Sequence, residues 1–215
     1  EDDKKMREWI NRVSSESNLG SMRELLDLLR FVTNQKEDLG HVLESVSGVK
    51  ESNISEDIEG ALIVQAQMVG KPAIDLLVEA LKDSTAGARE KAGRVLAAIA
   101  EKASAAEITN TVYPLTFDAV SVVLINDKDW DSRTAAAVAL ENIIKKLSLE
   151  IAIEQSKIIF RNMKFDLHAY QAIIIANAIK KSYRIKALTP LLNSDISMAR
   201  YGAAKSIAQD ARRGA

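Results

Sequence analysis

The feature that most constrains the fold is a motif that occurs three times between residue 83 and the last residues of the chain. In two copies an aspartate precedes an arginine by six residues, Asp83 with Arg89 and Asp127 with Arg133. A third copy keeps Arg200. Small and aliphatic residues follow each arginine at helical spacing. Recurrence at a few tens of residues is typical of stacked supersecondary units, so the pattern indicates a repeat protein.

Positions three, seven and ten residues after the arginine share one helix face. This face is small or apolar in four segments, and the Arg200 copy departs only at Asp210, as expected where a terminal repeat faces solvent. The aligned positions are Glu59, Arg89, Arg133, Ala169 and Arg200. Another amphipathic stretch precedes each later segment, at 72–81, 114–125, 150–160 and 185–192. With only nine glycines and three prolines in the chain, the unit is a helix, a short polar turn and a second helix.

Three further amphipathic stretches, 5–13, 21–32 and 38–46, match the repeat poorly. We expect them to form N-terminal capping helices within residues 1–53, continuous with repeats at 54–215 as one domain. The 44-residue step between Arg89 and Arg133 is long and leaves room for an insertion around residues 103–111.

The repeat, with an aspartate in the turn and an arginine near the start of the second helix, resembles the HEAT-repeat family over residues 54 to about 211. The resemblance implies an all-α fold, a right-handed α-α superhelix of stacked helix pairs. It also implies a scaffold or adaptor that presents a curved surface, which is an analogy from fold to function. Ala169 and Glu59 depart from the family pattern, and armadillo-like repeats are close relatives of this class.

The acid and arginine pairs suggest two interpretations. Arginine recognises phosphate and carboxylate groups, which would make the pairs a binding site. The favoured interpretation is a structural ladder of ion pairs and N-cap bonds that holds neighbouring units in register. Its members are Asp83, Arg89, Asp127, Arg133 and Arg200.

Basic pairs end three successive second helices, and more basic residues follow the middle pair. Residues 1–60 hold 14 acids and 8 bases, whereas residues 143–215 hold 5 acids and 13 bases. The pairs therefore predict a basic ridge for phosphates or an acidic partner. The helix macrodipole, which favours cations in last turns, accounts for the same residues. The ridge comprises Lys145, Lys146, Lys180, Lys181, Arg184, Arg212 and Arg213.

Aromatic residues form the other candidate contacts with a partner. Trp130 lies in a turn with Lys128, where its ring either anchors a partner or fills the gap between repeats. Tyr170 and Tyr201, which follow aligned positions, share this ambiguity, and so does Trp9.

Little in the sequence supports an enzyme. The chain has no cysteine and two histidines, His41 and His168, without metal-ligand spacing, so we expect no metal and no cofactor. Trp130, Asp131 and Arg133 faintly resemble the cleft of HEAT-like alkylpurine DNA glycosylases, but a second tryptophan is missing nearby.

The sequence therefore predicts a non-catalytic scaffold that binds a protein partner, in which the second helices line the concave side. The alternative is a nucleic-acid-binding repeat protein that uses the basic ridge. The chain shows no long apolar run and no signal-peptide pattern, so we expect a cytoplasmic protein without a membrane span.

Overall fold

The computed structural model describes residues 2–16, 19–34, 51–183 and 185–213. Across these residues the chain is helical and contains no strand, which confirms the all-α class. The predicted helix at 38–46 lies outside the described residues.

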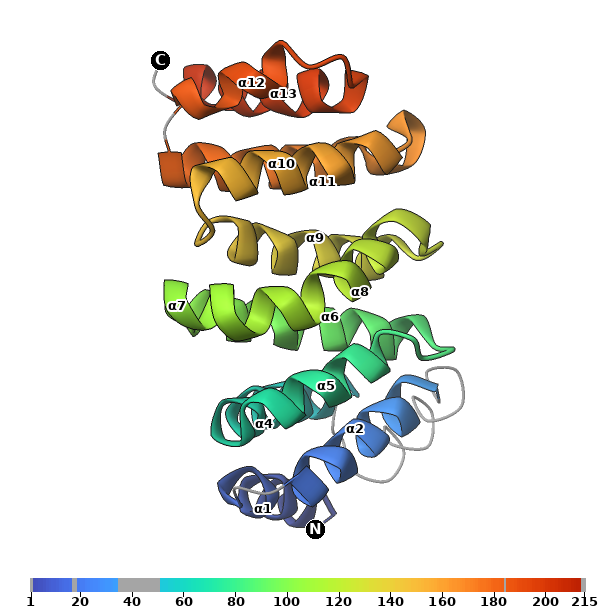
Figure 1. Cartoon of the computed structure of the whole chain (residues 1–215). Coiled ribbons are helices and arrows are strands. Elements are labelled where there is room, and N and C mark those ends of the chain that lie inside the picture. The colour runs from blue at the N-terminus through green and yellow to red at the C-terminus, as the bar shows by residue number, and fades with distance from the viewer. Residues whose placement is uncertain (1, 17–18, 35–50, 184, 214–215) are drawn as a thin grey trace.

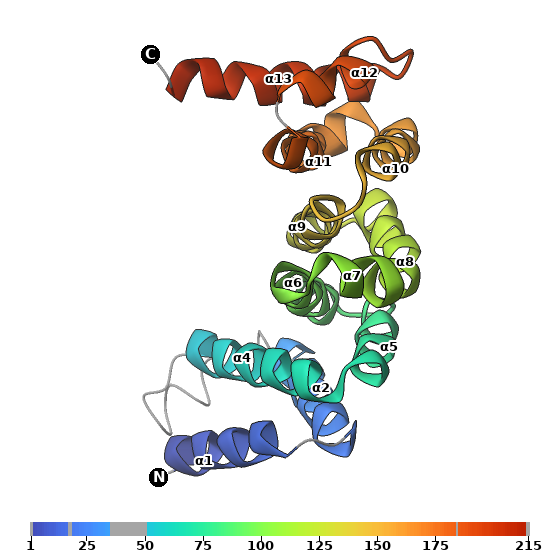
Figure 2. The same ribbon diagram turned by 60° about the vertical axis from the view of Figure 1, so that its left-hand side comes forward.

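The helices lie in two layers that stack from one end of the molecule to the other (Figures 1 and 2). In Figure 2 the outline is bowed, and the second helices lie on the inner side of the curve. The outer layer holds the first helices: α2 (Leu19–Asn34), α5 (Lys71–Ala80), α8 (Tyr113–Asn126), α10 (Leu149–Asn162) and α12 (Thr189–Leu192). The inner layer holds α1 (Asp2–Ser15), α4 (Glu51–Val69), α6 (Ala86–Lys102), α9 (Trp130–Ile144), α11 (Phe165–Tyr183) and α13 (Ser197–Arg213).

The second helices pack closely because small residues line their mutual contacts. A Cβ added at Gly93 on α6 would lie 3.0 Å from the Cβ of Ala135 on α9, and one added at Gly202 on α13 would lie 2.7 Å from the carbonyl oxygen of Ala172 on α11. Such short separations leave no room for a larger side chain. The small residues that follow each aligned position therefore set the spacing of the stack.

Hydrogen bonds across the inner layer show that its helices run parallel. Ser132, near the start of α9, donates to the carbonyl oxygen of Ala86 at the start of α6, 3.1 Å away. Asn142, near the end of α9, donates to the carbonyl oxygen of Ala97 over 2.9 Å. The same register therefore applies at both ends of the α6–α9 junction. Between α9 and α11, Gln171 donates to the hydroxyl of Thr134 and Ser182 to the carbonyl oxygen of Lys145. Between α11 and α13, Ser206 donates to the side-chain oxygen of Asn177, so equivalent positions of these second helices lie beside each other.

The additional residues before the Arg133 repeat lengthen a helix. They form α7 (Ala105–Glu107) and a π-helical turn, η1 (Ile108–Val112), which continue directly into α8. Ser104 caps this run, because its hydroxyl accepts from the backbone N–H of Glu107 over 3.2 Å and the Glu107 carboxylate accepts from the N–H of Ser104 over 2.7 Å. The expected insertion is therefore a helical extension.

The run Ala105–Asn126 is also long and apolar enough, by length and composition alone, to cross a membrane. A core helix of a soluble protein passes the same test. Phe117, Val120 and Leu124 of this run are buried, whereas Val122 is 58% exposed. Helix α8 packs against α5 and α9.

The two ends of the chain depart from the regular helix pair. The predicted helix at 185–192 is a 3₁₀ turn, η2 (Ile185–Leu188), followed by the four-residue α12. At the other end, α1 and α2 pack against α4. Gln65 of α4 donates hydrogen bonds to the carbonyl oxygens of Val13 and Glu16, so the capping helices contact the first repeat directly.

Candidate partner-binding face

The three arginines of the repeat share one arrangement. Each guanidinium donates from Nη1 to two consecutive backbone carbonyls in the turn before its own helix. Arg89 bonds Asp83 and Ser84, Arg133 bonds Asp127 and Lys128, and Arg200 bonds Ser194 and Asp195, over 2.7 to 3.0 Å. A guanidinium presents several donors in a rigid fork, which suits this double contact. The arginine therefore fixes each turn to the second helix, and we call this double contact the arginine clamp.

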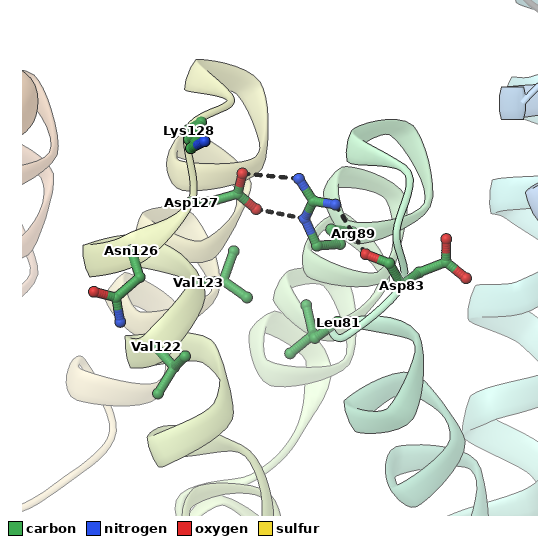
Figure 3. Close-up of a pocket in the computed structure, with 8 residues that line it drawn as sticks. All are labelled: Leu81, Asp83, Arg89, Val122, Val123, Asn126, Asp127 and Lys128. Carbon is green, nitrogen blue, oxygen red and sulfur yellow. Dashed lines mark hydrogen bonds and ion pairs between the residues drawn. The ribbon is translucent and has the colours of Figure 1, made fainter.

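Arg89 also reaches the next unit. Its Nε and Nη2 donate to the two carboxylate oxygens of Asp127 over 2.6 and 2.9 Å, whereas the Asp83 carboxylate turns away from the guanidinium (Figure 3). Asp83 instead accepts from the N–H and the hydroxyl of Thr85. The acid and arginine in direct ionic contact therefore belong to neighbouring units.

Burial and hydrogen bonding act in opposite directions on the Asp127 carboxyl. Burial raises its pKa, but the hydrogen bond from Arg89, the N–H of Asp129 and the charges of Arg89 and Arg133 together hold that pKa below its usual value. The bond to Asp127 is the largest cause that raises the pKa of Arg89. Both groups are thus held in their charged forms.

The equivalent contact is absent one unit further along. Met163 directly follows α10 as Asp127 directly follows α8, in a similar extended conformation, and it offers no carboxylate to Arg133. The Nε of Arg133 is buried without a hydrogen-bond partner. Among the described ladder residues, direct ion pairing between units is thus seen between Arg89 and Asp127.

In the unit formed by α10 and α11, where Ala169 occupies the arginine position, His168 takes the place of the arginine clamp. Its Nδ1 accepts from the N–H of Lys164 over 2.9 Å and thereby caps the start of α11. Nε2 is buried and faces the carbonyl of Ile125 without a hydrogen bond of normal geometry. Burial, followed by the charge of Arg133, lowers the pKa of His168, so the imidazole is a neutral structural group.

Two lysines of the basic ridge are engaged within the fold. Lys146 donates to the carbonyl oxygens of Ala100, Glu101 and Ala103, which end α6. Lys180 is 11% exposed and contacts the Ser206 carbonyl and the Asp210 carboxylate of α13 over 2.8 and 3.0 Å. These two side chains join neighbouring second helices.

Among the other described members of the ridge, Lys181 and Arg212 are exposed, whereas the Lys145 side chain is 27% exposed. Lys145 and Lys181 both contact Oε1 of Glu141, over 3.1 and 3.0 Å, and the Lys181 side chain is 60% exposed. Arg212 is exposed. Arg184 and the side chain of Arg213 lie outside the described residues. We call Lys145, Lys181 and Arg212 the basic row.

Three aromatic side chains form a second row on the same helices. Trp130 at the start of α9 is 51% exposed, Tyr170 on α11 is 54% exposed, and Tyr201 on α13 is half-buried. The rings of Trp130 and Tyr170 lie 5.7 Å apart across the α9–α11 junction. We call these three residues the ring row. Lys128 does not belong to it, because its side chain lines a hollow beside Arg89 and Asp127 (Figure 3).

The spacing of the two rows follows from helix geometry. Tyr170 and Lys181 are eleven residues apart on α11, as are Tyr201 and Arg212 on α13. Eleven residues make about three helical turns, so ring and cation lie on one face about 16 Å apart. Because the inner helices run parallel in register, the rings line one edge of the face and the cations the other.

Acidic residues lie at the α6 side of this face. A groove of about 430 Å³ runs between α6 and α9, with Trp130 and Asp131 among its lining residues. It is also lined by Glu101 and by Arg94, whose guanidinium pairs with Glu90 over 2.7 Å. Glu101 occupies on α6 the place that the basic row occupies on the following helices. The charge of the face therefore changes sign between α6 and α11.

The residues that resemble a glycosylase cleft do not assemble into one. Trp9 packs against the core from α1, and the ring beside Trp130 is a tyrosine. Asp131 lies at the groove, while the Arg133 side chain is buried in its clamp. Among the described residues no group of histidines and acids has a metal-binding arrangement.

Sequence analysis missed Phe165 and Glu141. Phe165 is exposed at the start of α11, and its ring lies 4.9 Å from that of Tyr201 in an edge-on contact. Glu141 joins two members of the basic row. The eleven-residue spacing of ring and cation could have been found in the sequence, but the position of Glu141 between two helices could not.

Comparisons with known proteins leave the family open. No protein-family model matches the chain, and no curated protein matches it. Among solved structures, the chain is similar to the crystal structure of an engineered protein, with 17% identity and a TM-score of 0.45, over 94% of this chain and 87% of that chain. A likeness of this extent assigns no function.

Proposed function

We propose that the chain is a HEAT-like α-solenoid, a right-handed superhelix of helix pairs, and that it acts as a non-catalytic scaffold. Its partner is a protein segment that binds the inner face of α9, α11 and α13. The recurring arginine clamps, the parallel inner helices and the bowed outline support this architecture.

The observation that carries the functional proposal is the exposure of Trp130 and Tyr170 in the ring row and of Phe165 beside Tyr201. The chain has ten aromatic residues, and Trp130, Tyr170 and Phe165 each leave about half or more of their surface to solvent within one region. Exposed aromatic side chains gathered in one place are typical of protein-binding surfaces. The neighbouring basic row and the α6–α9 groove extend this surface.

Selection from a phage-displayed library of random peptides tests the proposal. Wild-type protein is compared with a variant carrying Trp130→Ala, Tyr170→Ala and Tyr201→Ala, and with Tyr113→Phe as a control away from the face. We expect peptides that bind wild type and Tyr113→Phe but lose at least about tenfold in affinity for the triple variant. Selected peptides that bind all three proteins equally would contradict the proposed face.

The alternative function, nucleic-acid binding, keeps support from the exposed lysine and arginine of the basic row. Lys146 and Lys180 already bond within the fold, which leaves fewer cations for phosphates. The discriminating variant is therefore Lys181→Glu with Arg212→Glu. Oligonucleotide binding that weakens steeply with salt and is lost in this variant would favour nucleic acid over a protein partner.

A further inference from the structure

The charges along the inner face are arranged asymmetrically. At the α9–α11 junction, Lys145 and Lys181 share the single carboxylate of Glu141, which leaves one net positive charge. Arg212, which is exposed, continues the row on α13. The edge opposite the rings therefore attracts carboxylates. Lys205 lies on the other side, 5.8 Å from the centre of the Tyr201 ring.

The middle of the face is aliphatic on α9 and α11. Val138 on α9 and Ile174 on α11 are partly buried and pack against the core. Ile174 lies four residues beyond Tyr170 and seven before Lys181, and Val138 lies eight residues beyond Trp130 and seven before Lys145, so both lie between the two rows. The face thus has a ring edge, a basic edge and, on α9 and α11, an aliphatic centre.

Its dimensions suit a helix. The rows lie about 16 Å apart, while an α-helix with its side chains is about 10–12 Å across. Three helices at spacings of about 8–10 Å extend for about 18 Å, which corresponds to about 12 residues of bound helix. The remaining distance of about 4–6 Å is within reach of the long lysine and arginine side chains of the basic row. A helix lying across α9, α11 and α13 can therefore touch both rows at once.

We propose that the segment bound by this face is an amphipathic acidic helix. Its apolar stripe contacts the ring row and the aliphatic centre, and its flanking carboxylates pair with Lys181 and Arg212. The inference rests on the proposed protein-binding function and adds the chemistry of the partner. A basic segment would be repelled by the cations of the basic row. A nucleic acid would find cations for its phosphates along one edge only.

Three labelled peptides of about 16 residues test this chemistry. The first carries leucines at i, i+3, i+4 and i+7 with glutamates on one flank. The second replaces the glutamates with lysines, and the third scrambles the first so that the leucine stripe is lost. Fluorescence anisotropy gives the Kd of each peptide for wild-type protein, and we expect the acidic peptide to bind at least about tenfold tighter than the other two.

Charge variants then locate the contact. Lys181→Glu with Arg212→Glu should weaken the acidic peptide about tenfold at low salt. Glu101→Lys is the matched control, because it extends the basic row to α6 and should strengthen the same peptide about threefold. Unchanged unfolding curves for the variants show that folding is not the cause.

The outcomes separate this inference from the function on which it rests. If the lysine peptide binds as well as the acidic one, and Trp130→Ala weakens it, the face binds protein but the acidic assignment is wrong. If no peptide binds better than its scrambled form and an oligonucleotide does, both statements are wrong. Tight binding of the acidic peptide that ignores both charge variants would also overturn the inference.

Discussion

Removal of the Asp127 carboxylate should destabilise the stack because it breaks the link between two units. The side chain of Asp127 is 4% exposed and that of Arg89 is 18% exposed. Loss of one partner from a buried ion pair costs about 3–5 kcal/mol. Arg89 keeps its two carbonyl contacts and some solvent, so Asp127→Ala should lower the free energy of unfolding by about 3 kcal/mol, at the lower end of that range.

The structure supplies a matched control. Arg200 makes the same clamp to its own turn and is exposed. Arg200→Ala should therefore cost about 1 kcal/mol, the value of exposed hydrogen bonds. A double-mutant cycle of Asp127→Asn and Arg89→Met isolates the contact between units, and we expect a coupling of about 2 kcal/mol.

Urea unfolding followed by far-UV circular dichroism measures each free energy. A coupling below about 0.5 kcal/mol, within the range of additive sites, would refute the reasoning. So would equal losses for Asp127→Ala and Arg200→Ala, because the buried link would then add nothing to the clamp.

The same link has a pH dependence of known sign. The folded protein lowers the pKa of Asp127 below its ordinary 3.8. The unfolded chain therefore binds a proton first as the pH falls, so this stabilisation is present above pH 3.8 and is lost as the pH drops through the folded pKa. Asp127→Asn should remove that part of the acid dependence.

Three further predictions concern packing, the buried histidine and the lysines. Gly202→Ala should lower the free energy of unfolding by about 2 kcal/mol because its Cβ would meet the Ala172 carbonyl oxygen. Gly60→Ala, on an open helix surface, should raise it by about 0.5–1 kcal/mol. Urea unfolding measures both. His168 has a lowered pKa in the fold, so wild type should lose stability as the pH falls below 6.5, and in the same titration the His168→Gln variant should lose less. Lys146→Met should cost about 2 kcal/mol through the lost carbonyl contacts, but Lys181→Met less than about 0.5 kcal/mol; equal thermal unfolding of these two would contradict the distinction.

The sequence predicted the elements of the fold better than the partners of its side chains. Helical periodicity located α5, α9, α10 and α11, because burial of one face dictates which residues are apolar. The small residues around Gly93 and Gly202 signalled close packing for the same reason. Periodicity could not show that the residues before Tyr113 continue the helix through a π-helical turn. The composition of these residues suits a helical extension and an irregular insertion equally.

The candidate site was less accessible from the sequence. Lys180 and Lys181 are neighbours in the chain, but the helix turns them about 100° apart, so one contacts α13 and the other faces solvent. Composition cannot separate such a pair. In the same way, the spacing of Asp127 and Arg133 suggested partners, but the carboxylate that meets a guanidinium comes from the adjacent unit.

Because Met163 offers no carboxylate to Arg133, the α9–α11 junction should differ mechanically from the junction before it. In a stack where each helix pair contacts its neighbours, stiffness is set junction by junction. Arg89 and Asp127 hold the preceding junction from within, whereas here the corresponding guanidinium nitrogen has no partner. The rings of Trp130 and Tyr170 span this same junction, so a ligand that contacts both rings would hold the two helices together from outside. Occupancy of the face would then stiffen the molecule where the contact between an arginine and a carboxylate is missing.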